Sequence, residues 1–526
     1  MSSNKNITLT CRQDIASEFN RYFVDVALKL NNEVFGLNQT NFSDKCYLNE
    51  TLFLNPASTY EVAKIVSGLQ NKSSTDIFGL SNFIVKQIFP NIVDVFTHIL
   101  NLSFSTGTVP DKLKIAVVIP LFKTGDKLLK ENYRPISLLP IFSKVLEKVM
   151  KSRIMSFLNK FDFFNVCQFG FRENKSTEGA LTYFLNQIYM SLNNDENVAG
   201  IFIDIKKAFD MVNHTTLLSK LHNAGFRGIS FNWFKSYLEN RQQCVKIGDI
   251  GSGLSEIKIG VPQGSVLGPI LFLIYINSVF ELPLSGKMVA FADDMALAYN
   301  HLNKFQMINN INSDLKLLSQ WFSDHRMILS EKTRAMIFKI GDNPNYENSS
   351  LTYHFNCSSL DKNCTQHCVN IEYVKEFKYL GITLDANLNW KKHVNNVAIY
   401  LNSLLRKFYI LRNLCPMYIL KNVYYALVQS KIEYGLVCFG GIYESIIKRM
   451  IKIQKHIVKV MFFKSRVSSS WPIFSKNKIL PVRSLYCYKV LKLFYCNSGN
   501  RGFKLNERYN CRSNLMNLYT IPKIKK

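Results

Sequence analysis

Two apolar segments that each deliver acidic side chains constrain the fold of this chain more than any other feature. VAGIFIDI at 198–205 predicts a buried strand that carries Asp204 near its end, and MVAFADDMALAY at 288–299 predicts two short strands joined at Asp293 and Asp294. A charge at the end of a buried strand costs several kcal/mol unless it is paired or binds a metal. An Asp-Asp pair alone is typical of an ordinary turn, but the two segments together indicate that the carboxylates form a functional site.

Carboxylates on separate strands can share divalent cations. Two ions about 3.5–4 Å apart promote in-line phosphoryl transfer. Magnesium suits such a site, because a few carboxylates and the phosphates of the substrate are enough to hold it. The pattern therefore predicts a site for two Mg²⁺ ions, with Mn²⁺ as an alternative, where the three aspartates meet.

The remaining periodicity predicts a mixed α+β body followed by helices. A chain of 526 residues is long enough to bury a sizeable core, and no internal repeat or Gly/Ser-rich linker divides it. The expected strands lie at 113–122 and 377–384, a hairpin turn at 246–253, and helices at 11–70, at 141–160, from His214 and throughout the C-terminal part.

The positive charge is concentrated at the C-terminal end. Of a formal net charge of +27, residues 386–526 carry +23, from 26 basic and three acidic residues. Such a segment repels itself unless a polyanion is its normal neighbour, and nucleic acid is the simplest such partner. An anionic membrane surface or a solubilising role are the alternatives. A basic stripe within this segment has helical spacing and is formed by Lys448, Lys452, Lys455 and Lys459.

Cysteine usage and hydropathy indicate an intracellular protein. The twelve cysteines are scattered, and a chain of this length needs no disulfide framework. No cationic and apolar leader is visible at the start. The apolar run 266–280 is shorter than the ~20 residues needed to span a bilayer, and Pro269 interrupts it. We expect a location in the nucleus, the cytoplasm or both, with no membrane partner.

Six sequence blocks carry a family resemblance. The blocks are IPLFKTGDKLLKENYRPISLL (119–139), QFGFRENKST (168–177), FIDIKKAFDMVNH (202–214), GVPQGSVLGPILF (260–272), FADD (291–294) and FKYLGI (377–382). They occur in the order and spacing of reverse transcriptases, and the chain most resembles the polymerase region of a non-LTR (LINE-type) retrotransposon protein. The resemblance covers about 110–385.

The resemblance implies the α+β right-hand polymerase fold, with fingers, palm and thumb. An antiparallel palm sheet and an all-helical, basic C-terminal module are expected. The implied domains are a helical N-terminal extension at 1–100, fingers and palm at 101–385, a helical thumb at 386–465, and a basic C-terminal tail of unknown role at 466–526.

The resemblance also assigns the catalytic centre. Asp204, Asp293 and Asp294 match the catalytic, metal-binding aspartates, and the carbonyl of Ile205 is expected to bind metal as well. Phe209 matches the steric gate, whose ring would collide with a ribose 2′-hydroxyl and so favour deoxynucleotides. Its ordinary alternative is a core phenylalanine.

Other matched positions surround the nucleotide and the primer. Lys123 and Arg134 match cations that hold the incoming triphosphate, and Gln263 matches the residue beside the nucleotide and template. Surface charge and a glycine-rich turn are the respective alternatives. Template or primer contacts are implied for Arg172, Gly264, Tyr379, Leu380 and Gly381. A salt bridge for Arg172 and a plain sheet edge for FKYLGI remain open. Lys332 is a candidate general acid for the leaving pyrophosphate.

The favoured function is an RNA-directed DNA polymerase. Its expected partners are an RNA template, a DNA primer or target DNA, and deoxynucleoside triphosphates (dNTPs); no protein partner is predictable. A catalytically silent or domesticated copy that binds nucleic acid is the first alternative, and a group II intron maturase is the second. The sequence leaves open which RNA or target site is used, the oligomeric state and whether the element is active.

Two further absences are expected from the sequence. We expect no endonuclease ahead of the polymerase blocks, because the segment before about residue 110 is predicted to be helical and is too short for a nuclease of two packed sheets. We expect no RNase H domain after the thumb, because such a domain needs clustered carboxylates and only three glutamates occur after Asp385. Zinc is not expected at Cys357, Cys364 and Cys368 with His367, because their spacing fits none of the common zinc patterns.

Overall fold

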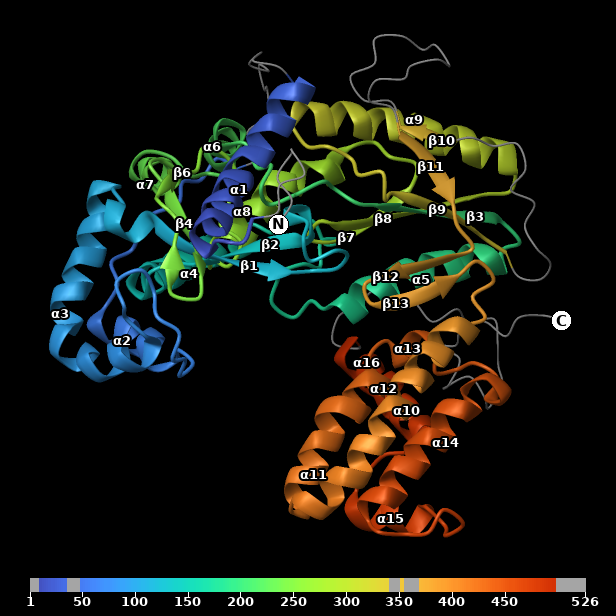
Figure 1. The fold of residues 1–526 in the computed structure, drawn as a ribbon. Coiled ribbons are helices and arrows are strands. Elements are labelled where there is room, and N and C mark those ends of the chain that lie inside the picture. Colours follow the sequence, from blue (N-terminus) through green and yellow to red (C-terminus); the bar gives the residue numbers. More distant parts are fainter. Residues whose placement is uncertain (1–8, 36–47, 340–350, 354–368, 498–526) are drawn as a thin grey trace.

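The computed structural model describes residues 9–35, 48–339, 351–353 and 369–497. The fold is mixed α/β with largely antiparallel sheets. In Figure 1 the sheets and the N-terminal helices form one body, and the C-terminal helices extend from it beside the β12–β13 hairpin.

The central sheet has six strands in the order β10-β11-β9-β3-β8-β7. Its middle strand β3 runs antiparallel to both β8 and β9. The strands are β3 (Asn197–Ile203), β7 (Lys287–Phe291), β8 (Asp294–His301), β9 (Arg334–Phe338), β10 (Leu351–Tyr353) and β11 (Val369–Tyr373).

Both faces of this sheet are covered, which explains the continuous apolar sequence of β3. Ile201 and Ile203 belong to the core that includes α8 (Gly268–Ile276) and α9 (Lys304–Asp324). Val198 and Phe202 point to the opposite face and belong to the core that includes α5 (Thr177–Asn193) and the C-terminal helices. Figure 1 shows α9 and α5 on opposite sides of the sheet.

A second sheet stands beside the first, with strand order β2-β1-β4-β5 and β6 also paired to β4. Helix α1 packs on β4 and β5. The elements are α1 (Arg12–Phe35), β1 (Ile115–Phe122), β2 (Tyr133–Leu138), β4 (Gln242–Ile247), β5 (Ile250–Gly251) and β6 (Ser255–Glu256). The remaining elements of the body are α4 (Ile141–Lys160), α6 (His214–Asn223), α7 (Ile229–Leu238) and the short helices η1 (Asp111–Lys114), η2 (Lys130–Asn132) and η3 (Asn277–Glu281).

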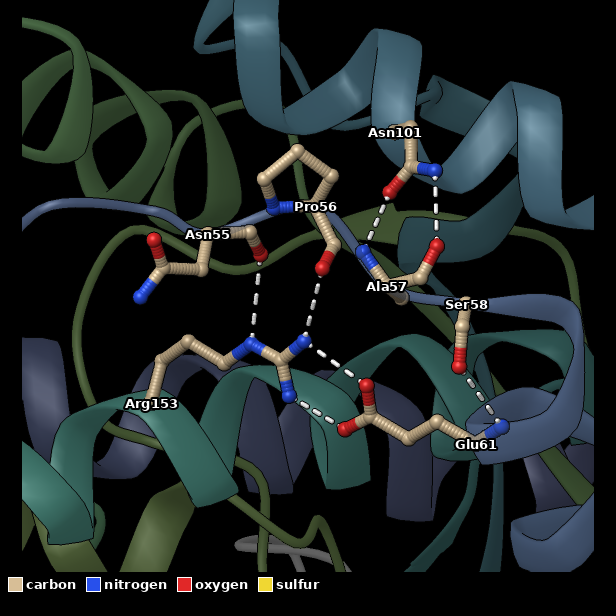
Figure 2. Close-up of polar contacts among 7 residues, drawn as sticks. All are labelled: Asn55, Pro56, Ala57, Ser58, Glu61, Asn101 and Arg153. Carbon is tan, nitrogen blue, oxygen red and sulfur yellow. Dashed lines mark hydrogen bonds and ion pairs between the residues drawn. The ribbon is translucent and has the colours of Figure 1, made fainter.

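The N-terminal region is not helical throughout 11–70, so that prediction is wrong for residues 48–58. These residues precede α2 (Thr59–Ser67) without regular structure. Figure 2 shows why they need none: Arg153 of α4 donates to the carbonyls of Asn55 and Pro56 and pairs with Glu61. Distant side chains satisfy the backbone, which no local pattern reveals.

Asn101 completes this arrangement from α3 (Asn82–Thr106). Its side chain accepts from the Ala57 N–H at 2.7 Å and donates to the Ala57 carbonyl at 3.0 Å (Figure 2).

By length and composition alone, α3 is the single described helix apolar enough to cross a membrane. Core helices pass the same test, and α3 buries Val85, Phe89 and Leu100.

The C-terminal helices follow a hairpin rather than the single strand expected at 377–384. Strands β12 (Glu376–Tyr379) and β13 (Ile382–Asp385) are joined at Leu380 and Gly381, both of which have a positive φ. The helical elements are α10 (Lys391–Leu414), α11 (Met417–Tyr424), the π-helix η4 (Tyr425–Gln429), α12 (Ser430–Glu433), α13 (Leu436–Phe439), α14 (Glu444–Met461), α15 (Trp471–Asn477) and α16 (Val482–Asn497).

Three of the four lysines of the predicted basic stripe are exposed on α14: Lys448, Lys452 and Lys455. The fourth, Lys459, is half-buried and donates to the Arg466 carbonyl at 2.8 Å. Helix α10 buries an apolar stripe formed by Val397, Leu401, Leu404 and Phe408. The predicted tail is folded as far as 497, because α16 buries Leu485 and its Lys489 pairs with Glu178 of α5 at 2.8 Å.

Candidate active site

The three aspartates meet at one end of the central sheet. Ile203, the last residue of β3, pairs with Met295 of β8. Asp204 directly follows Ile203, and Asp294 directly precedes Met295. The two carboxylates therefore come from adjacent strand ends. Asp293 lies beside them in the two-residue turn between β7 and β8, after Ala292 in left-handed conformation with φ +58°. The antiparallel register therefore brings together the residues that the sequence predicts.

These carboxylates repel one another. Burial raises the pKa of Asp294 to about 6, with added contributions from the negative charges of Asp293 and Asp204. Burial also raises the pKa of Asp293, and the Asp204 charge adds to that effect. In the described part of the chain, no side-chain donor bonds to any of the three carboxylates. The ionised cluster is therefore favourable only when cations approach it.

Two cations, Lys123 and Arg134, face this cluster. Lys123 follows β1 and Arg134 lies on β2, where the pairing of Phe122 with Tyr133 places them near each other. Burial lowers the pKa of Lys123, the charges of Arg134 and Lys332 lower it further, and Asp204 and Asp293 raise it. The second sheet thus places positive charge opposite the end of the central sheet that carries the aspartates.

The aspartates have the donor chemistry of a magnesium site, although among the described residues no group of three or more acid, His or Cys side chains could hold a metal ion by itself. Magnesium is usually held by one or two carboxylates together with substrate phosphates. A bound cation would relieve the repulsion that the charges of Asp293 and Asp204 exert on the ionised Asp294 carboxylate. The Cys357, Cys364, His367 and Cys368 group lies outside the described residues.

The segment after Asp204 is fixed by the loop that carries Lys332. The backbone N–H of Asp204 donates to Thr333 Oγ1 at 3.3 Å, and its carbonyl accepts from the Ser330 N–H at 2.7 Å. Ile205 forms a β-bridge with Leu329. Lys332 itself is exposed.

Phe209 is half-buried beside this cluster. Its ring stacks on Phe272 of α8, with centroids 4.5 Å apart and 22° between the planes. A third ring, Phe171, meets it edge-on at 6.2 Å and 88°. The position thus combines core packing with partial exposure.

Gln263 is connected to the same segment. Its side-chain amide donates to Asp210 Oδ1 at 2.8 Å, and its carbonyl accepts from the Ser137 N–H of β2 at 2.7 Å. Gly264 has φ +117°, and a Cβ there would lie 2.6 Å from the Ser137 carbonyl oxygen. Glycine is therefore required for the loop to approach β2 so closely. Burial raises the pKa of Asp210, and the bond from Gln263 opposes that shift.

Arg172 makes its contacts within its own loop. Its guanidinium donates to the Asn165 carbonyl at 2.7 Å and to the Gln168 carbonyl at 3.3 Å, and lies over the Phe164 ring. These bonds are not the salt bridge that the sequence left open. The template or primer contact expected for Arg172 stays a prediction.

The β12–β13 hairpin lies against the face of the central sheet that carries Phe202. The Phe377 ring stacks on Phe202 at 4.4 Å, and Tyr379 contacts the same ring at 5.3 Å. Burial, and secondarily the Asp294 charge, raise the pKa of Tyr379. Leu380 accepts a hydrogen bond from Tyr434, which ties the hairpin to the C-terminal helices.

Sequence reasoning missed Gln168, which holds the turn that carries Asp293. This side chain is 1% exposed, and its Oε1 accepts from the Ala292 N–H at 3.0 Å and from the Gly170 N–H at 2.8 Å. A Cβ on Gly170 would collide with the Ala292 backbone. The signal was present in QFGFR, where a glutamine and a glycine flank one aromatic residue.

A second missed residue is Glu147 of α4, which is fully buried. Its carboxylate accepts from the Tyr237 hydroxyl at 2.8 Å, from the Val266 N–H at 2.6 Å and more weakly from the Leu267 N–H at 3.4 Å. Burial raises its pKa, and the charge of Arg241 opposes that shift. Glu147 thereby anchors the chain between the Gln263 loop and α8.

A pocket of about 480 Å³ opens beside the Gln263 loop. It is lined by Ser137 and Gly264 on one side and by Lys72, Lys144 and Lys148 on the other. Burial lowers the pKa of Lys144. Three lysines and one carboxylate, Asp76, thus line this pocket, which gives it a net positive charge.

Comparisons with known proteins agree with this geometry. A family model described as reverse transcriptase (RNA-dependent DNA polymerase) matches residues 122–384. The probable RNA-directed DNA polymerase from transposon X-element of Drosophila melanogaster is 28% identical over 78% of this chain and 44% of its own length. The RNA-directed DNA polymerase from mobile element jockey of the same species is 26% identical over 74% of this chain and 42% of its own length.

A third relative comes from another insect. The retrovirus-related Pol polyprotein from the type-1 retrotransposable element R1 of Bradysia coprophila is 26% identical over 63% of this chain and 32% of its own length. The chain thus spans less than half the length of the relatives it matches.

Proposed function

The chain belongs to the reverse transcriptase family, and on that premise we propose that it is an RNA-directed DNA polymerase of the non-LTR retrotransposon type. The observation that carries the proposal is the meeting of Asp204 with Asp293 and Asp294 at adjacent strand ends, opposite Lys123 and Arg134. One sheet supplies carboxylates and the other supplies cations, as a nucleotidyl transfer from a triphosphate to a primer hydroxyl requires.

We assign the regions of the chain accordingly. The palm comprises 198–214 and 256–385, and the fingers comprise 101–200 with the insertion at 215–255. The thumb at 386–465 would contact the template–primer duplex through its basic face. Such duplexes are recognised mainly by shape and backbone, which suits an exposed row of lysines on α14.

The reaction extends a DNA primer along an RNA template. The primer 3′-oxygen forms a bond to the α-phosphorus of the dNTP, and the bond from that phosphorus to the pyrophosphate oxygen breaks. The 3′-hydroxyl proton leaves to solvent, and Lys332 donates a proton to the departing pyrophosphate. Two magnesium ions, held by the aspartates and the Ile205 carbonyl, would activate the 3′-hydroxyl and neutralise the developing charge.

The remaining residues position the reactants. Lys123 and Arg134 hold the triphosphate, and Phe209 meets the sugar where a 2′-hydroxyl would project. Gln263 and Gly264 border the base pair being formed, and the basic pocket beside them offers phosphate contacts to the template. Tyr379, Leu380 and Gly381 support the primer end.

Primer extension tests this proposal. The full chain is given an RNA template, an annealed DNA primer, dNTPs and Mg²⁺, beside the Asp293→Ala, Asp294→Ala double variant. We expect extension by the wild type and a loss on the order of 10³-fold in the variant, because several kcal/mol of transition-state stabilisation disappear. Template–primer binding by the variant should persist.

The alternative is a copy that binds nucleic acid without catalysis. Tight, salt-sensitive binding by both proteins with no extension by either would establish that alternative and contradict the polymerase. Extension of equal rate by both proteins would contradict the assignment of the aspartates.

A further inference from the structure

One loop touches two parts of the proposed site at once. At one end of the loop 167–172, Gln168 bonds to the catalytic turn at Ala292. Three residues later, Phe171 presents its edge to the ring of Phe209. Phe171 is 45% exposed, so hydrophobic burial alone does not account for its position.

The backbone at Phe171 is strained and actively held. Its φ of +52° lies in the left-handed region, which bulky residues rarely adopt because the Cβ atom crowds the following carbonyl oxygen. The guanidinium of the next residue, Arg172, fixes the loop through the carbonyls of Asn165 and Gln168. Strain maintained by neighbouring contacts points to a role for the residue that bears it.

The role follows from what surrounds Phe209. Phe272 stacks against one face of that ring and Phe171 meets it edge-on, so two directions of movement are blocked. A ring that discriminates by collision is effective only when it cannot yield to the added hydroxyl. The constraint on the ring therefore sets how strongly a ribonucleotide is rejected.

We propose that Phe171 is a positioning residue for sugar selection, which holds Phe209 against the 2′-hydroxyl of an incoming ribonucleotide. This inference rests on the proposed polymerase function and on Phe209 as the gate. Phe171 does not itself touch the nucleotide; it acts through the ring that does.

Single-nucleotide incorporation by the full chain tests the inference, with kcat/KM measured for UTP and for dTTP opposite a template adenine. Phe171→Ala should raise the UTP/dTTP ratio of kcat/KM by about 3- to 10-fold, the factor that corresponds to one aromatic pair. Phe209→Ala should raise it more. In the Phe209→Ala background, Phe171→Ala should add nothing, because its effect passes through the missing ring.

Three further variants keep the result interpretable. Phe171→Tyr retains the aromatic edge and should keep the wild-type ratio. Phe171→Leu retains bulk without a ring and should give an intermediate ratio even if Phe171→Ala does not fold. Phe83→Ala removes a comparably exposed ring from α3 and should leave the ratio unchanged.

Each other outcome overturns the inference in a distinguishable way. An unchanged ratio in Phe171→Ala beside a raised ratio in Phe209→Ala removes Phe171 from the mechanism. An equal rise in both backgrounds shows that Phe171 does not act through Phe209, and an unchanged ratio in Phe209→Ala removes the gate itself. Absence of dTTP incorporation by the wild type contradicts the proposed function.

Discussion

The same α/β body holds acidic side chains with raised pKa values in two places, and their surroundings differ in kind. Glu147 is fully buried, and its carboxylate accepts hydrogen bonds from a tyrosine hydroxyl and two backbone N–H groups. Asp293 and Asp294 also have raised pKa values, but part of that rise comes from the negative charge of neighbouring aspartates. Burial alone therefore does not separate a structural carboxylate from a catalytic one. The difference lies in whether the protein itself supplies the partners.

The largest effect on stability is expected at Glu147. Glu147→Ala leaves two backbone N–H groups and the Tyr237 hydroxyl without an acceptor, so the free energy of unfolding should fall by about 3 kcal/mol. Glu147→Gln keeps an acceptor oxygen and should lose less. Urea unfolding measures both, with the exposed Glu173→Ala as the control that should stay within about 0.5 kcal/mol of wild type. A loss in Glu147→Ala no larger than in the control would contradict the structural role.

Gln168 combines features of both groups, because its buried Oε1 accepts two backbone N–H groups and holds the turn that carries Asp293, whereas its Nε2 is buried without a hydrogen-bond partner. Gln168→Ala leaves the Ala292 N–H unpaired beside Asp293, and we expect kcat for nucleotide incorporation to fall by about 10-fold as the turn loses its anchor. The KM for dNTP should change less, since no contact to the nucleotide is removed. A change confined to KM would indicate that Gln168 acts on nucleotide binding instead.

The smallest expected effect is the pH dependence that Asp294 gives to the free energy of unfolding. A carboxyl whose pKa is raised on folding destabilises the fold once it ionises, so the penalty from Asp294 should grow as pH rises from its ordinary value of 3.8 to about 6. Because Asp294 is largely exposed, we expect Asp294→Asn to gain less than about 1 kcal/mol at pH 7 and nothing at pH 3.

Activity should show the opposite pH response to stability. Incorporation by the wild type should fall as pH drops through about 6, because a protonated Asp294 cannot bind a cation. Raising the Mg²⁺ concentration should move that midpoint to lower pH. A midpoint that does not respond to Mg²⁺ would assign the titration to another group.

The sequence predicted that the three aspartates lie together because their signal is local. Each lies at the end of an apolar run, and antiparallel pairing needs only short strands to bring them together. Gln168 and Glu147 were missed because their partners lie 124 and 119 residues away along the chain. Long-range hydrogen bonds leave no periodicity in the sequence.

The errors in the fold have the same physical origin. Residues 48–58 were predicted as helix, but Arg153 and Asn101 satisfy their backbone from other helices. The hairpin at 376–385 was predicted as one strand, although Gly381 marked the turn that its positive φ now explains. Local turn chemistry could have corrected the second error, whereas nothing local could have corrected the first.

The comparison is tested most directly by measuring incorporation and unfolding on one variant, Asp293→Asn with Asp294→Asn. This change keeps the shape of the turn and removes its charge. The account predicts that single-nucleotide incorporation on an RNA template is lost, while the free energy of unfolding in urea at pH 7 is unchanged or higher than wild type. Retained incorporation, or a loss of stability as large as that of Glu147→Ala, would contradict it.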